Sequence, residues 1–344
     1  MSASVQIRRV SPPAAAPGGE VLIECEGFDT SRLGAYSAHI GGEQARLVGA
    51  STTRVLASVP EELPGGDAEV ELESGGERSE PARLLVGTLL AEDLHMVASP
   101  AFDPADGSLY VTRSGSRGHR EPVSLFRVGA GGLGGLEDVT GEITNPTGMA
   151  FDATGQLYVS SRNDGAVYRV SRAGEVVPFA QDLGIATGLA FDRRGRLYVG
   201  DRTGTIHRVN GIGQAQEWAQ VEPSVAAFHL AFGPDDALYV TGPTVSSNDS
   251  VTRIDEYGRT STYFKGLGRP GGLAFDAEGR LYVAASYRAR RGVIRISADA
   301  ARAELFVAAM NAIGVALGPG GQLAVATNDS VFSFPLGVRG TLIK

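Results

Sequence analysis

The chain has 344 residues, of which 42% are hydrophobic and 20% charged, a balance typical of a folded globular protein. Its formal net charge of −8 opposes binding to a nucleic-acid backbone or an anionic membrane, so an anion site would have to be local. The 47 glycines and the near absence of helix-favouring stretches predict an all-β protein of short strands and tight turns.

Residues 1–87 contain short apolar runs separated by turns rich in Gly and Pro. The runs that we expect to form strands are 5–10, 21–25, 38–42, 54–59, 68–72 and 82–86. This pattern predicts an immunoglobulin-like β-sandwich. The only cysteine, Cys25, alternates in phase with Val21 and Ile23, so we expect it in the core, and no intramolecular disulfide can form.

The turn residues of this segment resemble those of the IPT/TIG family of immunoglobulin-like domains. The matching features are Ser11-Pro12, Pro17-Gly18-Gly19, Gly27, Ile40-Gly41-Gly42, Val59-Pro60, Pro64-Gly65-Gly66 and Gly75. Members of that family are mostly spacer or interaction modules. The resemblance therefore implies that residues 1–87 carry no catalysis.

From about residue 95 one pattern recurs roughly every 42 residues. It consists of Gly-Leu-Ala-Phe-Asp, a turn that ends in Gly, Leu-Tyr-Val, a variable loop and an alternating strand. The copies span 98–112, 147–160, 187–200, 228–241, 271–284 and 313–326, and their second strands open at Leu109, Leu157, Leu197, Leu238, Leu281 and Leu323. This period is that of a four-stranded blade, so residues 88–344 are predicted to form a six-bladed β-propeller.

The last repeat stops after its third strand, at 330–334. The missing strand is predicted upstream, because residues 89–99 align with residues 178–188, which hold the fourth strand of another repeat. Residues 88–92 would then close the ring as the outer strand of the last blade. Almost no linker is left around Val86–Leu89, so we expect little hinge motion between the domains 1–87 and 88–344.

These repeats resemble the NHL-repeat and gluconolactonase (regucalcin)-like propellers. The resemblance implies a ligand site at the central channel, where the lactonase branch holds a divalent metal with Asn or Asp directly before the repeat Gly and a Glu from another blade. Here those positions are Ala98, Thr147, Thr187, Phe228, Gly271 and Ile313. Such side chains suit a hard cation poorly, and Pro146 disfavours a register shift that would bring in Asn145. We therefore expect neither metal nor cofactor, and no catalytic residue is assigned.

The channel mouth nevertheless offers candidate ligand-binding residues, namely Thr147, Thr187, Phe228 and His229. His229 replaces the Gly of its repeat, so it belongs either to a site or to a channel plug in which Phe228 fills the remaining space. His207 is expected on the surface. The five histidines are scattered without metal-ligand spacing.

The longest loops follow the second strand of a repeat, at 114–121, 242–250 and 286–292, and would all rim one face. These loops and their counterparts are rich in arginine: Arg113, Arg117, Arg120, Arg162, Arg202, Arg288, Arg290 and Arg291, with His119 among them. Glu121, Asp164, Asp201 and Asp249 oppose them. Arginine forks suit carboxylates and phosphates, so the face is either an anion site or a mixed, solvated rim.

The leading functional hypothesis is a non-enzymatic scaffold that binds a protein or a small anionic ligand with this face. The first alternative is a gluconolactonase-like hydrolase that uses the channel. The second is a surface for RNA or an acidic partner built on Arg288, Arg290, Arg291 and the 117–120 loop, although the net charge argues against nucleic acid. We expect a monomer away from membranes and, because no secretory signal is visible, a cytoplasmic location.

Overall fold

The computed structural model describes residues 4–31, 34–94, 99–132, 134–246 and 248–340. The chain is built of strands and turns, with one short 3-10 turn at Ala130–Gly132 (η1) among these residues, which confirms the all-β prediction. No helix in the described ranges is long and apolar enough to cross a membrane.

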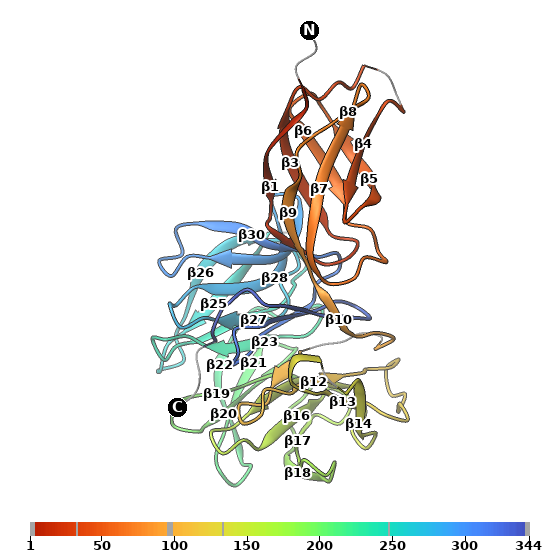
Figure 1. Ribbon diagram of the computed structural model, residues 1–344. Helices are drawn as coiled ribbons and strands as arrows, with labels where there is room; N and C mark the ends of the chain where they lie inside the picture. Colours follow the sequence, from red (N-terminus) through yellow and green to blue (C-terminus); the bar gives the residue numbers. More distant parts are fainter. Residues whose placement is uncertain (1–3, 32–33, 95–98, 133, 247, 341–344) are drawn as a thin grey trace.

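The N-terminal strands stack as an elongated unit above the rest of the chain (Figure 1). They are β1 (Gln6–Ser11), β2 (Ala14–Ala15), β3 (Glu20–Glu26), β4 (Tyr36–Ile40), β5 (Glu43–Ala50), β6 (Arg54–Ser58), β7 (Gly66–Ser74), β8 (Glu77–Arg78) and β9 (Ala82–Val86). They pair in the order β1-β3-β6-β5-β4-β7-β9-β2, with β8 on β7. Their shared core includes Ile23, Val70 and Leu72. Cys25 is buried there as predicted, and burial raises the pKa of its thiol.

Below this unit, five separate four-stranded sheets form the blades of a propeller. Their strands are β11 (Ala101–Phe102), β12 (Leu109–Thr112), β13 (Leu125–Val128) and β14 (Leu136–Thr140); β15 (Pro146–Phe151), β16 (Leu157–Ser161), β17 (Ala166–Val170) and β18 (Val176–Ala180); β19 (Ala186–Phe191), β20 (Leu197–Asp201), β21 (Thr205–Val209) and β22 (Ala215–Gln220); β23 (His229–Phe232), β24 (Leu238–Thr241), β25 (Asp249–Ile254) and β26 (Thr260–Leu267); and β31 (Gly314–Leu317), β32 (Leu323–Ala326), β33 (Val331–Phe334) and β10 (Thr88–Ala91).

The prediction of six separate blades needs correction at the repeat near Gly271. Its strands are β27 (Leu273–Phe275), β28 (Leu281–Tyr287), β29 (Arg290–Ile296) and β30 (Ala303–Ala308). They pair antiparallel in sequence order, but they are not a separate sheet, because β30 also pairs in parallel with β2. The result is one 13-stranded sheet that runs from the N-terminal strands into the propeller.

The repeat pattern places the second strands correctly. Strands β12, β16, β20, β24, β28 and β32 all begin at the predicted leucines. The turn before each is stabilised by its own aspartate where the repeat has one. In the turn before β16, the Asp152 Oδ1 accepts hydrogen bonds from the backbone N–H groups of Thr154 at 2.9 Å and Gln156 at 3.0 Å. Gly155 supplies the left-handed φ of 82° at the exit.

The predicted pairing of residues 88–92 with the last repeat is present. Strand β10 lies on β33, with Thr88 opposite Ser333 and Leu89 opposite Phe332. Only Gly87 separates β9 from β10, so the connection is as short as the sequence indicated. The Gly87 N–H also donates to the Ala15 carbonyl at 3.0 Å, which ties the connection to β2.

The N-terminal strands and the propeller are joined by more than the chain itself. Strand β2 lies between β9 and β30, and the Ala16 N–H donates to the Ala308 carbonyl at 2.8 Å. On the same side, the Arg290 guanidinium donates through Nη2 to the carbonyls of Glu20 at 2.9 Å and Ser11 at 3.2 Å. Burial lowers the pKa of Arg290, but its backbone acceptors compensate for part of the lost hydration.

Replacing Arg290 by methionine should therefore destabilise the junction by about 2 kcal/mol, because two charge-assisted hydrogen bonds to backbone carbonyls are lost. The measurement is the free energy of unfolding by urea, together with the rate of thermolysin cleavage near Gly87. Arg288→Met in the same hairpin is the matched control, because that guanidinium stacks over the Tyr287 ring at 5.1 Å. Equal effects of the two variants would show that Arg290 does not hold the junction.

Candidate functional site

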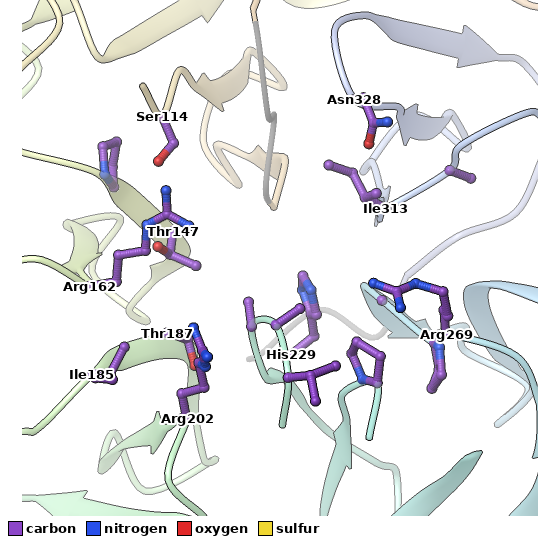
Figure 2. A pocket seen from close by; sticks show the side chains of 18 residues that line it. Ser114, Thr147, Arg162, Ile185, Thr187, Arg202, His229, Arg269, Ile313 and Asn328 are labelled. Carbon is purple, nitrogen blue, oxygen red and sulfur yellow. The ribbon is translucent and has the colours of Figure 1, made fainter. Parts of the chain in front are cut away.

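A cavity of about 370 Å³ opens at the mouth of the propeller channel (Figure 2). It is lined by residues that precede the inner strands and residues that follow the second strands of several blades. The lining residues are Ser114, Pro146, Thr147, Arg162, Ile185, Thr187, Arg202, Val225, Ala226, Ala227, His229, Pro243, Arg269, Pro270, Gly271, Ala312, Ile313 and Asn328.

Among the described residues, three arginines and no carboxylate line this cavity. Arg162 directly follows β16 and Arg202 directly follows β20, so the same repeat position sends both guanidinium groups to the mouth. Arg162 Nη2 donates to the Gly115 carbonyl at 3.4 Å, and Arg202 Nε donates to the Ser224 carbonyl at 3.2 Å. Within the described residues, none of the lining arginines forms an ion pair.

Arg162 is the most constrained of the three. Burial lowers the pKa of its guanidinium, and the positive charges of Arg202 and Arg117 lower it further. Its Nε atom is buried without a hydrogen-bond partner among the described residues. An anion placed here would supply both the missing acceptor and the missing counter-charge.

Arg269 reaches the cavity from another blade, in the connection between β26 and β27. It adopts a left-handed φ of 47°, which is uncommon for a residue other than glycine or asparagine. Its backbone N–H donates to the buried carboxylate of Asp249 at 3.1 Å, which fixes the backbone there. The guanidinium of Arg269 points toward the cavity (Figure 2).

Hydroxyl and amide groups complete the polar lining. The Thr187 Oγ1 is occupied, since it donates to the Gly200 carbonyl at 2.9 Å and accepts from the Phe228 N–H at 3.1 Å. Ser114 differs, because its side chain is only 3% exposed and its Oγ has no partner among the described residues. A buried hydroxyl without a partner is costly unless a ligand satisfies it.

His229 lies beneath the cavity between its two arginine-bearing sides (Figure 2). His229 and Ser99 stand at a repeat position that is glycine in other repeats, for example Gly148 and Gly188. Their side chains meet, because the Ser99 Oγ and the His229 Nδ1 are 3.1 Å apart. The pair connects the start of β23 with the segment before β11.

A serine next to a histidine could in principle act as a nucleophile and its base. Here burial lowers the pKa of His229 to about 4, so the imidazole is neutral at pH 7 but a weak base. Its hydrogen bond to Ser99 is the only one that its side chain makes with the described residues, so no carboxylate orients the ring. The pair therefore fits a channel plug better than a catalytic dyad.

The cavity does not fit a divalent cation. Ca²⁺ and similar ions need several oxygen ligands with negative charge, whereas this lining carries three guanidinium groups. Across the described part of the chain, no group of three or more His, Cys, Asp or Glu side chains could hold a metal ion. The chemistry that the cavity supports is the binding of an anion, and no step through a metal is derived.

The structure brings together five of the predicted site residues, namely Thr147, Thr187, His229, Arg162 and Arg202. Phe228 needs correction: it is 3% exposed and packs with Tyr198, Leu230 and Val240 between blades, so it does not line the cavity. Ala98 lies outside the described residues. The prediction for His207 is also wrong, because this residue is 9% exposed in β21 and burial lowers its pKa.

Loop 114–121 is a loop, as predicted, and Asn145 holds it in place. The Asn145 amide donates to the carbonyls of Gly115 at 2.9 Å and Ser116 at 3.1 Å, and its Oδ1 accepts from the Gly118 N–H at 2.8 Å. Arg117, His119 and Arg120 are exposed on this loop and outside the cavity lining. Arg120 is already engaged, because its Nε donates to the Gly141 carbonyl at 2.8 Å.

The third expected rim loop, 286–292, is not a loop. Strand β28 continues to Tyr287, and strand β29 begins at Arg290. Arg288 and Ala289 form the tight turn between them, with φ of 48° and 60°. The long strands place Arg290 against the N-terminal backbone, while Arg288 stacks on Tyr287 and Arg291 is exposed on β29. These three arginines are therefore not part of the cavity.

The sequence reasoning missed Arg269 and Ser114. A signal was present, since Arg269-Pro270-Gly271 aligns with Asn145-Pro146-Thr147, and an arginine there replaces an asparagine suited to the left-handed conformation. For Ser114, no sequence feature indicated an unpartnered hydroxyl.

Comparisons with known proteins bear on the fold. No family model matches the sequence, and no curated protein matches it. Among solved structures, an auxiliary nutrient binding protein from Bacteroides thetaiotaomicron has 14% identity and a TM-score of 0.55, covering 96% of this chain and 98% of that one. The neighbours share the fold alone.

Two further structures resemble the propeller part. A gluconolactonase from Xanthomonas campestris has 17% identity and a TM-score of 0.59, covering 73% of this chain and 89% of that one. Virginiamycin B lyase from Staphylococcus aureus has 15% identity and a TM-score of 0.50, covering 72% of this chain and 86% of that one. The fold thus occurs in binding proteins and in enzymes, and the likeness does not choose between them.

Proposed function

We propose that this chain is a non-enzymatic binding protein that holds a small organic anion at the channel mouth, on the face that carries the long loops. The observation that carries the proposal is the charge of the cavity: Arg162, Arg202 and Arg269 line it without a carboxylate. In a protein with a net charge of −8, such a local concentration of unpaired positive charge is best explained by an anion. The fold that this chain shares with a nutrient binding protein over 96% of its length is compatible with the proposal.

The rest of the lining narrows the ligand to an anion with an apolar body. Ile185, Val225 and Ile313 line the cavity with several alanines and prolines, and apolar walls with a few fixed polar groups are typical of small-molecule sites. A bare inorganic ion would leave these walls hydrated. A small organic acid would cover them and place its charge on the arginines.

The architecture that presents this site is part of the proposal. We propose that β27–β30 acts as the sixth blade and that β10 closes the ring, with residues 88–344 as the propeller domain. Residues 1–87 would be an IPT/TIG-type immunoglobulin-like module, rigidly attached through β2 and Arg290. The nearly uniform spacing of the leucines that open β12 to β32 supports the blade assignment.

Calorimetric titration of the full chain with benzoate and benzamide tests the proposal, because the two differ in charge and hardly in shape. We expect benzoate to bind at least about tenfold more tightly, and Arg162→Gln to remove most of that advantage, since a charge-assisted hydrogen bond is worth about 1.5–3 kcal/mol. Arg194→Gln is the matched control, because Arg194 lies in the turn before β20, at the opposite end of that strand from Arg202.

Equal binding of benzoate and benzamide, or an equal loss in the Arg194 and Arg162 variants, would contradict anion recognition at this cavity. The hydrolase alternative predicts a different outcome. It requires that the chain hydrolyse gluconolactone at a rate that depends on a residue of the cavity, whereas the binding proposal expects the background rate with and without Arg162→Gln.

A further inference from the structure

The cationic groups of the cavity are divided between two sides. In Figure 2, Arg162 and Arg202 lie together on one side, Arg269 lies on the other, and His229 lies between them. The positive charge of Arg202 lowers the pKa of Arg162, whereas Arg269 is not among the groups that shift this pKa. This agrees with a separation of the two sides. A single carboxylate on the Arg162 side would leave Arg269 without a counter-charge.

The material between the two sides is uncharged. In Figure 2 the neutral His229 lies between them, while Ile185 lies beside Arg202 and Ile313 lies on the side of Arg269. Among the described residues, the charged groups of the lining are thus the arginines of the two sides, and much of the remaining lining is apolar. A ligand that matches it has an anionic group at each end and an apolar middle.

Arg269 also stands in a costly conformation. The equivalent residues of two other repeats are Asn145 and Asn311, with φ of 47° and 55°, and asparagine tolerates this region better than arginine. Backbone strain of this kind is commonly found at functional positions. The Asp249 carboxylate holds the Arg269 backbone in that conformation and so directs the side chain into the cavity.

The Arg162 side has the further features of a built site. The buried Nε of Arg162 and the buried Oγ of Ser114, neither of which has a hydrogen-bond partner in the described part of the chain, both belong to residues of the cavity lining. A carboxylate has two oxygens, so it can accept from a guanidinium and a hydroxyl together. This side is thus suited to the more tightly held end of the ligand.

We infer that the ligand is a dicarboxylate with an apolar middle, bound with one carboxylate on Arg162, Arg202 and Ser114 and the other on Arg269. The inference rests on the proposed function, because it takes anion binding at the cavity as given. It adds the number of charges and the residues that bind each end.

Calorimetric titration of the full chain with succinate, adipate and suberate, each against butyrate, hexanoate or octanoate of the same length, tests the inference at constant ionic strength. We expect at least one diacid to bind about tenfold or more tightly than its matched monoacid. Arg269→Gln should remove this preference and leave monoacid affinity nearly unchanged. Arg162→Gln should weaken both acids.

The outcomes separate the inference from the proposed function. If the monoacids bind as tightly as the diacids, or if Arg269→Gln leaves the preference intact, the two-ended ligand is wrong while anion binding stands. If neither series binds and benzoate also fails, the proposed function itself is wrong. Arg194→Gln, which removes one positive charge away from the cavity, should reproduce the wild-type affinities for both series.

Discussion

Replacing Gly148 by alanine is expected to lower the free energy of unfolding by about 3 kcal/mol. Gly148 lies on β15, and a Cβ added there would be 2.2 Å from the Thr187 carbonyl oxygen and 3.1 Å from the Gly188 Cα on the neighbouring inner strand. These are backbone atoms, so no rotation of a side chain relieves the contact. The inner strands would have to separate, and the packing of two blades would loosen.

Guanidinium unfolding of Gly148→Ala, followed by fluorescence of the single tryptophan, Trp218, measures this cost. Gly211→Ala is the control, because an added Cβ there meets nothing within 4 Å and the residue has no left-handed φ. That variant should unfold near the wild-type midpoint or slightly above it. Coincident midpoints for the two variants would show that close approach of the inner strands does not stabilise the ring.

The same close approach explains why the repeat could be read from the sequence. A Cβ on Gly188 would meet the Phe228 carbonyl at 2.6 Å, and one on Gly272 would meet Gly314 at 2.8 Å. At Gly148, Gly188 and Gly272 the glycine is therefore imposed by the close approach of the neighbouring inner strand. The apolar Leu-Tyr-Val run is imposed by burial on both faces, as in β16 and β20. Both signals are local, so a single sequence carries them.

The junction could not be predicted in this way because it depends on contacts between distant segments. Strand β2 is two residues long and pairs with β30, and Arg290 binds the carbonyl of Ser11, 279 residues away. No periodicity marks such a strand. The extra length of β28 and β29 appeared in the sequence as a long, basic loop, because Arg288, Arg290 and Arg291 are typical of exposed turns.

The site was predictable where it follows the repeat. Arg162 and Arg202 occupy one repeat position, so both were expected on the rim, and Thr147, Thr187 and His229 follow from the channel register. Arg269 could be found only by asking which residue occupies the left-handed position. Whether an exposed arginine points into a cavity or along the surface, as Arg120 does toward Gly141, depends on backbone contacts that a sequence does not contain.

His229 should make the protein less stable in acid. Burial lowers its pKa to about 4 in the folded chain, against 6.5 for an ordinary histidine, so the unfolded state binds more protons between these values. Stability is therefore retained above pH 6.5 and lost as the pH falls toward 4. Between pH 7 and pH 4.5 this one group should cost about 2.5 kcal/mol.

Urea unfolding of wild type and His229→Gln at pH 7 and pH 4.5 isolates this contribution. The substitution removes the titrating group, so the variant should lose about 2.5 kcal/mol less than wild type between the two pH values, whatever its stability at pH 7. His119→Gln removes an exposed histidine of loop 114–121 and serves as the control. Parallel pH dependence of wild type and His229→Gln would mean that the imidazole is hydrated. Water would then reach the imidazole beside Ser99, and His229 would not be the buried, neutral group that the interpretation as a channel plug requires.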